Sequence, residues 1–144
     1  RDPVKALLDG TFGAYLWITL GKRSALAYGL PFDERLPRLQ DLDVFLRCAG
    51  AGIEFHKVTA KEPLCRYNKD DRGRNSAEVE RCFALIRQKH RFLIELYDKG
   101  YNKELKVKHL GVAARFAQSN GDTIRAHRYA FRRSVARIRN RLLA

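Results

Sequence analysis

Four carboxylates crowd into one short stretch of this chain, and they are the residues best placed to do chemistry. The whole chain carries a net charge of +13, yet four acids lie within eleven residues: Asp33, Glu34, Asp41 and Asp43. From Asp41 onward the apolar residues recur at helical spacing, which predicts a helix over residues 41–49. Exposed backbone N–H groups at a helix N-terminus favour a carboxylate and keep its pKa low, so position alone favours a cap at Asp41. The alternative is that the Asp41 carboxylate accepts a proton in a reaction.

A second candidate is the polar loop over residues 66–76, which combines acids with arginines. Arg72 and Arg74 suit a diphosphate, since one guanidinium can pair with two phosphate oxygens at once. Asp70 is a competent hard ligand for Mn²⁺ or Mg²⁺. The other interpretation of this loop is a solvated polar turn without a ligand.

The string FDERLPRLQDLDVFLR, residues 32–47, resembles the acceptor-side motif of inverting family 2 glycosyltransferases of the GT-A fold. That motif is a glycine turn with Phe-Asp-Glu, then a Glu-Asp or Gln-Asp pair opening a helix that ends in Leu-Arg. The resemblance covers residues 15–76 well. It implies that Asp41 is the general base that takes the proton from the acceptor hydroxyl, with Gln40 and Asp43 supporting the acceptor.

The same resemblance implies the reaction and its partners. A sugar would pass from a nucleotide-sugar donor, a UDP-sugar, to a saccharide or lipid-linked acceptor with inversion, in surface polysaccharide biosynthesis. Similar enzymes close a loop over the donor diphosphate, and Arg72 and Arg74 would bind it. They often have a metal-binding His where Asp70 stands here, so the substitution leaves a metal role for Asp70 open.

Such enzymes hold a divalent metal, Mn²⁺ or Mg²⁺, through a D-x-D motif in an N-terminal nucleotide-binding half. Asp41-Leu42-Asp43 has that spelling, but it follows the Phe-Asp-Glu turn instead of preceding it. We therefore expect the metal to be held mainly by residues upstream of Arg1. By this interpretation the chain lacks the donor-binding half and is inactive alone.

The fold predicted from these patterns is α/β. Residues 1–76 would form the acceptor-side part of a GT-A domain, and residues 77–144 a C-terminal extension of about three helices. The predicted strands are 14–20, 53–58 and 62–67, with Trp17 in the core. Besides 41–49, the predicted helices are 4–8, 24–28, a long one beginning near Ser76 and capped by Asn75, then 103–118 and 123–143.

Composition sets further bounds. The 144 residues suffice for a real core, and the basic balance suits an anionic partner such as a sugar nucleotide, a membrane surface or nucleic acid. Three cysteines without metal spacing indicate free thiols in a reducing compartment. No apolar run is long enough to span a bilayer. We therefore expect a cytoplasmic location, peripheral on the inner face of the membrane.

The last helix leaves a different class of function open. Residues 121–144 contain seven Arg and one Asp around an apolar stripe. This pattern fits an amphipathic helix on anionic lipid or a nucleic-acid contact, and it equally fits the solvated face of a helical hairpin. The rival function is thus a non-catalytic basic helical module that binds anionic membrane or nucleic acid. A degenerate, non-catalytic transferase fragment is a third interpretation.

Overall fold

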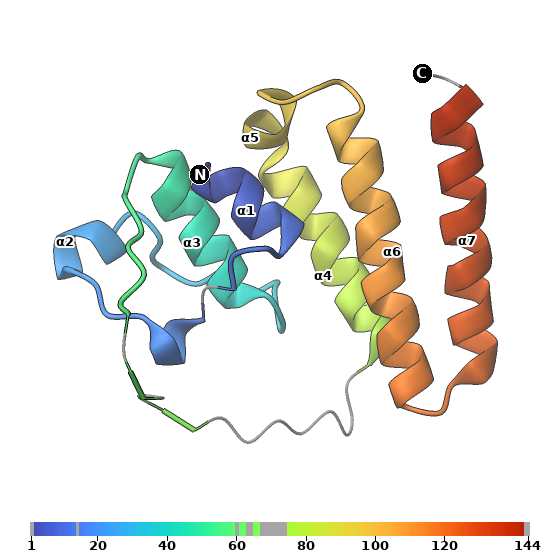
Figure 1. Ribbon diagram of the computed structural model, residues 1–144, viewed down its shortest axis with the longest axis horizontal. Helices are drawn as coiled ribbons and strands as arrows, with labels where there is room; N and C mark the ends of the chain where they lie inside the picture. The colour runs from blue at the N-terminus through green and yellow to red at the C-terminus, as the bar shows by residue number, and fades with distance from the viewer. Residues whose placement is uncertain (1, 14, 60, 63–64, 67–74, 143–144) are drawn as a thin grey trace. The chain divides into compact units, whose positions relative to one another are not determined.

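Helices make up the regular structure of this chain wherever the structure describes it (Figure 1). The computed structural model describes residues 2–13, 15–59, 61–62, 65–66 and 75–142. Within these ranges there are seven α-helices and one short 3₁₀ helix, and there is no strand. The predicted α/β fold, a partial GT-A domain with strands, is therefore wrong.

The structure describes residues 15–20 of the predicted strand 14–20, and they contain the 3₁₀ helix η1, Leu16–Ile18, in place of a strand. Its polar groups are satisfied locally, since the Ile18 amide and the Thr19 hydroxyl both donate to the Tyr15 carbonyl, at 3.1 and 2.7 Å. A buried strand needs a neighbouring strand for its backbone groups, and the described residues contain none. Trp17, predicted as core, is accordingly 48% exposed.

The other two predicted strands fail for a related reason. Residues 53–58 have no regular structure. The Phe55 ring packs edge-on against the rings of Phe12 and Phe45, with 5.6 and 5.8 Å between centroids. Of the predicted strand 62–67, the structure describes 62 and 65–66, none of them in a strand. Alternation of apolar and polar residues indicates only that the side chains suit a half-buried surface. A loop that packs on a helix also provides such a surface.

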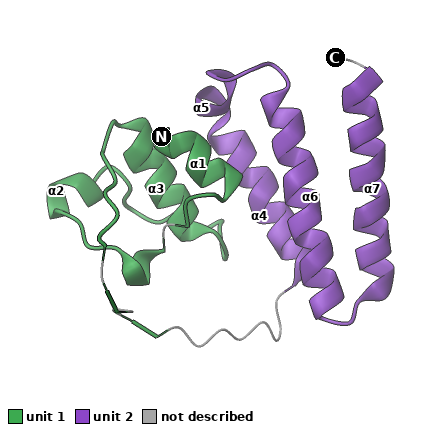
Figure 2. Ribbon diagram, viewed as in Figure 1, with its two compact units in different colours: residues 1–70 green, residues 71–144 purple. Residues whose placement is uncertain are grey.

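The chain divides into two compact units, residues 1–70 and 71–144 (Figure 2), where the sequence suggested a boundary after residue 76. In the first unit α1 (Pro3–Asp9) packs against α3 (Gln40–Gly50), and the short α2 (Arg23–Leu26) also contacts α3. The helix predicted at 41–49 is confirmed as α3. The unit's core is made of apolar side chains from these helices and the intervening loop, including Leu7, Leu8, Leu36, Val44, Phe45 and Leu46.

Gly29 lets the loop before α3 run directly against that helix. A Cβ atom at position 29 would lie 2.5 Å from Val44 Cγ1, 2.8 Å from the Val44 carbonyl oxygen and 2.9 Å from Cys48 Sγ. The carbonyl belongs to the α3 backbone, so the helix would have to move. We expect Gly29→Ala to lower the free energy of unfolding by about 1–3 kcal/mol, measured by urea denaturation.

A second glycine provides the control for this prediction. At Gly100 an added Cβ meets nothing within 4 Å, and the φ angle of −80° suits any residue. Gly100→Ala should therefore leave the unfolding midpoint nearly unchanged. Equal midpoints for the two variants would contradict the close approach at Gly29.

The second unit consists of α4 (Ser76–Lys89), α5 (Arg91–Glu95), α6 (Tyr101–Ser119) and α7 (Thr123–Leu142). Helix α6 is central to it, because α4, α5 and α7 all pack against α6 (Figure 1). Between α6 and α7 lies an apolar cluster of Leu110, Ala113, Ala117 and Tyr129. An ion pair of 2.7 Å between Glu80 of α4 and Arg132 of α7 adds a polar link.

The start of α4 agrees with the prediction, but the end of this helix does not. Asn75 is the N-cap, and its side-chain oxygen accepts the Ala77 amide at 3.0 Å. The single long helix predicted from there breaks at His90 into α4 and α5. Both helices pack against α6, so the stripe of apolar residues continues across His90. The spacing of apolar residues therefore does not indicate that the helix ends there.

Two histidines of the second unit, His90 and His109, are buried, and each is 5% exposed. The His109 ring stacks on Phe83 with 3.9 Å between centroids. Its Nδ1 lies 2.6 Å from an Arg87 guanidinium nitrogen, and because arginine can only donate, Nδ1 is the acceptor. Burial of that guanidinium lowers the pKa of Arg87.

Candidate functional site

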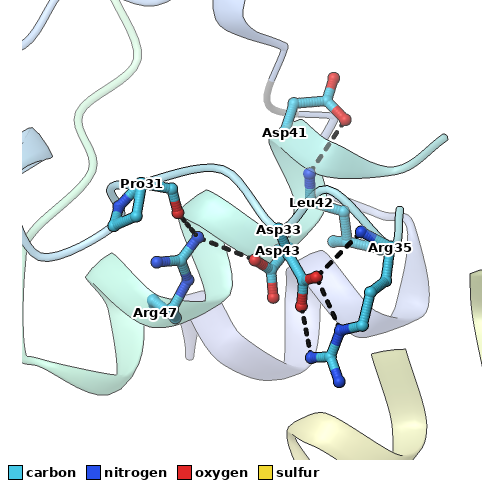
Figure 3. A network of polar contacts seen from close by, with 7 residues as sticks. All are labelled: Pro31, Asp33, Arg35, Asp41, Leu42, Asp43 and Arg47. Atoms are coloured by element: carbon cyan, nitrogen blue, oxygen red, sulfur yellow. Dashed lines mark hydrogen bonds and ion pairs between the residues drawn. The ribbon is translucent and has the colours of Figure 1, made fainter. Parts of the chain in front are cut away.

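The candidate site begins with a tight turn that leads into α3. Asp33 organises the turn: the Leu36 amide donates to its carbonyl at 3.0 Å, and its carboxylate accepts the Arg35 amide at 3.1 Å. The Arg35 guanidinium also binds this carboxylate in a fork, at 2.9 and 2.7 Å (Figure 3). Leu39 then adopts a left-handed conformation with φ of 65° and serves as the N-cap of α3.

Asp41 lies inside the first turn of α3 and is not its cap. Its carboxylate accepts the amide of the next residue, Leu42, at 2.9 Å (Figure 3). Burial raises the pKa of Asp41 above its ordinary value, and backbone N–H groups of Leu42 and Asp41 only partly offset this. The low pKa predicted from the helix terminus is therefore wrong, because desolvation of a carboxylate outweighs the nearby amides here.

Asp41 borders a pocket of about 640 Å³ in the first unit. Gln40 lies beside it in the pocket wall, and the turn before α3 contributes two more carboxylates, Asp33 and Glu34. The rest of the lining is apolar or aromatic, from Leu16, Trp17, Phe32, Leu36 and Pro37. The structure thus brings two predicted site residues, Gln40 and Asp41, into one concave surface together with acids from the same motif.

Asp43 has a different environment. Its side chain is fully buried, and it pairs with Arg47 at 2.8 Å one turn along α3. The same Arg47 nitrogen donates to the carbonyl of Pro31 at 2.8 Å, which ties the preceding loop to the helix (Figure 3). The resemblance implied an acceptor contact for Asp43, but its surroundings are those of a buried, salt-bridged acid. The carboxylate is not among the groups that line the pocket.

Trp17 is the site residue that the sequence did not indicate. It lines the pocket from η1, and the neighbouring Tyr15 ring stacks on it with 5.7 Å between centroids. A half-exposed pair of stacked aromatic rings beside carboxylates offers a flat apolar surface next to hydrogen-bond acceptors. No signal in the sequence placed Trp17 in a pocket, because its aromatic and β-branched neighbours indicated a buried strand.

The predicted donor loop, with Asp70, Arg72 and Arg74, lies outside the described residues. Within the described ranges no group of three or more His, Cys, Asp or Glu side chains could hold a metal ion. Among the described residues, the Mn²⁺ or Mg²⁺ ion that the resemblance implies therefore has no set of ligands that can be named. The same ranges contain no helix with the length and apolar character needed to cross a membrane.

Comparison with known proteins identified no relative of this chain. No protein-family model matches the chain, and neither curated proteins nor solved structures show significant similarity to it. The function of this chain must therefore be inferred from the geometry of the pocket and from the motif that lines it.

Proposed function

We propose that the pocket beside α3 binds a saccharide or lipid-linked sugar acceptor, and that Asp41 is the base for inverting transfer of a sugar from a nucleotide-sugar donor. One observation carries the proposal: a partly buried carboxylate of raised pKa borders a pocket that also presents an aromatic ring and further acids. Such a combination of a concave surface, a perturbed acid and convergent polar groups is typical of catalytic sites. It also coincides with the motif that resembles family 2 glycosyltransferases.

The chemistry needs a base next to the attacking hydroxyl. The acceptor oxygen forms a bond to the anomeric carbon of the donor, while the bond from that carbon to the diphosphate oxygen breaks. Asp41 takes the hydroxyl proton, and the nucleoside diphosphate leaves with the electron pair. Attack opposite the leaving group inverts the anomeric configuration. A desolvated carboxylate is a stronger base than an exposed one, so the raised pKa of Asp41 favours this transfer.

The remaining groups of the pocket suit the acceptor sugar. The exposed indole of Trp17 can cover the apolar face of a pyranose ring. At the sugar hydroxyls, Gln40 can donate or accept hydrogen bonds and the Glu34 carboxylate can accept them. Asp33 is held by Arg35, so it shapes the turn that presents Glu34. Binding of the donor remains assigned to Arg72 and Arg74 on the grounds of the resemblance alone. A divalent ion, where bound, would neutralise charge on the departing diphosphate.

Trp17 is the single tryptophan of the chain, so its fluorescence reports on this pocket directly. We expect titration with glucose, galactose, N-acetylglucosamine, rhamnose and their short oligomers to identify a sugar that shifts the Trp17 emission. Calorimetry with that sugar should show about tenfold weaker binding for Trp17→Ala, which corresponds to roughly 1.4 kcal/mol.

Ile18 supplies the matched control for this experiment. It lies on the same 3₁₀ helix with the same half exposure as Trp17, 49% against 48%, but it is not part of the pocket lining. Ile18→Ala should bind the sugar as the unmodified chain does. Equal losses for the two variants, or an unchanged Trp17 emission with every sugar, would contradict an acceptor site here.

A further inference from the structure

Helix α7 has two apolar faces, and only one of them is used within its unit. The packed face, with Ala126 and Tyr129, lies against α6. The exposed stripe lies about 180° away around the helix, within an arc of about 60°. It is formed by large side chains that are between 46% and 84% exposed: Ile124, Phe131, Val135, Ile138 and Leu142.

Cations border the exposed stripe on both sides. At 100° per residue Arg128 and Arg139 flank one edge and Arg141 the other. Helix α7 contains seven arginines and no acid. A groove of about 260 Å³ beside the stripe adds Lys103 and Lys106 from α6 to this basic rim, and no carboxylate lines it.

Charge decides which partner suits this surface. A second copy of the chain would bring the arginines of one α7 against those of another, which is unfavourable. Nucleic acid would pair with the cations but would leave the five large apolar side chains in water, which its phosphate backbone does not cover. A bilayer with anionic lipids satisfies both parts, because headgroup phosphates meet the arginines while the acyl boundary takes up the stripe.

We propose that α7 lies flat on anionic lipid, with the stripe from Ile124 to Leu142 inserted at the headgroup boundary. The arginines beside the stripe pair with lipid phosphates, and the groove between α6 and α7 extends the cationic contact through its two lysines. This surface belongs to the second unit, so the proposal does not depend on the sugar pocket of the first unit.

The test is co-sedimentation of the chain with vesicles. Phosphatidylcholine vesicles that contain phosphatidylglycerol should bind it at low salt, vesicles of phosphatidylcholine alone should bind it at least tenfold more weakly, and high salt should release it. Phe131→Ser should weaken binding about tenfold, because the buried ring is lost from the lipid contact. Arg128→Gln and Arg139→Gln should each weaken it about fivefold.

Phe92 provides the control variant, since it is 68% exposed on α5 against 70% for Phe131 on α7. Phe92→Ser should bind vesicles as the unmodified chain does, and circular dichroism should show that both variants remain helical. Equal effects of the two substitutions, or equal binding to neutral and anionic vesicles, would overturn the proposal. Two further results would also overturn it. One is absent vesicle binding together with duplex DNA binding that Phe131→Ser leaves intact. The other is a dimer in sedimentation that Phe131→Ser dissociates.

Discussion

Asp41→Asn should lower the rate of sugar transfer by about 10²–10⁴-fold, the range that a positioned base contributes. The amide keeps the shape of the side chain and can still accept the Leu42 amide, but it cannot take a proton from the acceptor. The measurement is kcat for transfer from a UDP-sugar to the sugar identified by Trp17 fluorescence. It is to be made with Mn²⁺ or Mg²⁺ present and, where this chain is one part of a longer protein, with that whole protein.

The control is Glu54→Gln, the same change of carboxylate to amide on an 83% exposed side chain of the first unit, outside the pocket. It should leave kcat unchanged. Calorimetry should show that Asp41→Asn still binds the acceptor sugar. If Asp41→Asn retains full turnover, Asp41 is not the base and the proposed reaction is wrong.

The same carboxylate predicts two pH effects. Turnover should fall as the pH drops through the pKa of Asp41, which burial places above the ordinary value of 3.8. The free energy of unfolding has the opposite pH dependence. At a pH between the pKa of Asp41 in the unfolded chain and its higher pKa in the folded chain, the folded state binds more protons. The free energy of unfolding therefore declines as the pH rises through this range. Asp41→Asn removes this effect and should therefore unfold at the same or a higher urea concentration at neutral pH.

Asp43→Ala should lower the free energy of unfolding by about 3 kcal/mol, because it leaves the Arg47 guanidinium partly buried without its carboxylate. The pair lies where α3 meets the loop through Pro31, so the loss also loosens the turn that carries Asp33 and Glu34. Urea denaturation at neutral pH measures the change. Sugar binding should weaken as well, since the pocket wall shifts.

Asp33 and Arg35 form the contrasting pair, in which the Arg35 side chain is 67% exposed. The Asp33 side chain is only 9% exposed, but Arg35→Ala should still change the unfolding midpoint less than Asp43→Ala does. The Asp33 carboxylate keeps the amide of residue 35 as a donor, and water replaces the exposed guanidinium. The double variant Asp43→Ala with Arg47→Leu should recover part of the lost stability, since no buried charge is then left unpaired. A midpoint for Asp43→Ala equal to that of Arg35→Ala would contradict the structural role of the buried pair.

Helix positions were largely predictable because their signals are local. Asn75 and Gly10 mark a start and an end through hydrogen bonds within a few residues: Asn75 caps α4, and the Gly10 amide closes the end of α1. The spacing of apolar residues located α3, α6 and α7 to within a few residues. Gln40 and Asp41 were named from the motif, and their common pocket follows from their adjacency at the start of one helix.

The strands were mispredicted because a strand is not a local structure. The run around Trp17 has the composition of a buried strand, but its backbone groups needed a partner that the described chain does not supply. The environment of Asp41 likewise escaped prediction. Its pKa depends on how deeply the loop and η1 cover the start of α3, and spacing along the chain carries no information about that coverage.

Most helices of both units, the acidic turn before α3 and the basic character of α7 could be predicted from the sequence alone. Each of these features depends on neighbours within one or two turns. The three-dimensional structure was needed to show that Asp43 is a buried, ion-paired acid. It was also needed to show that Asp41 borders a pocket and that Trp17 lines the same pocket. It also decided which apolar face of α7 is covered by α6 and which is left exposed. These outcomes depend on contacts between segments far apart in the chain, where desolvation and packing outweigh local preference.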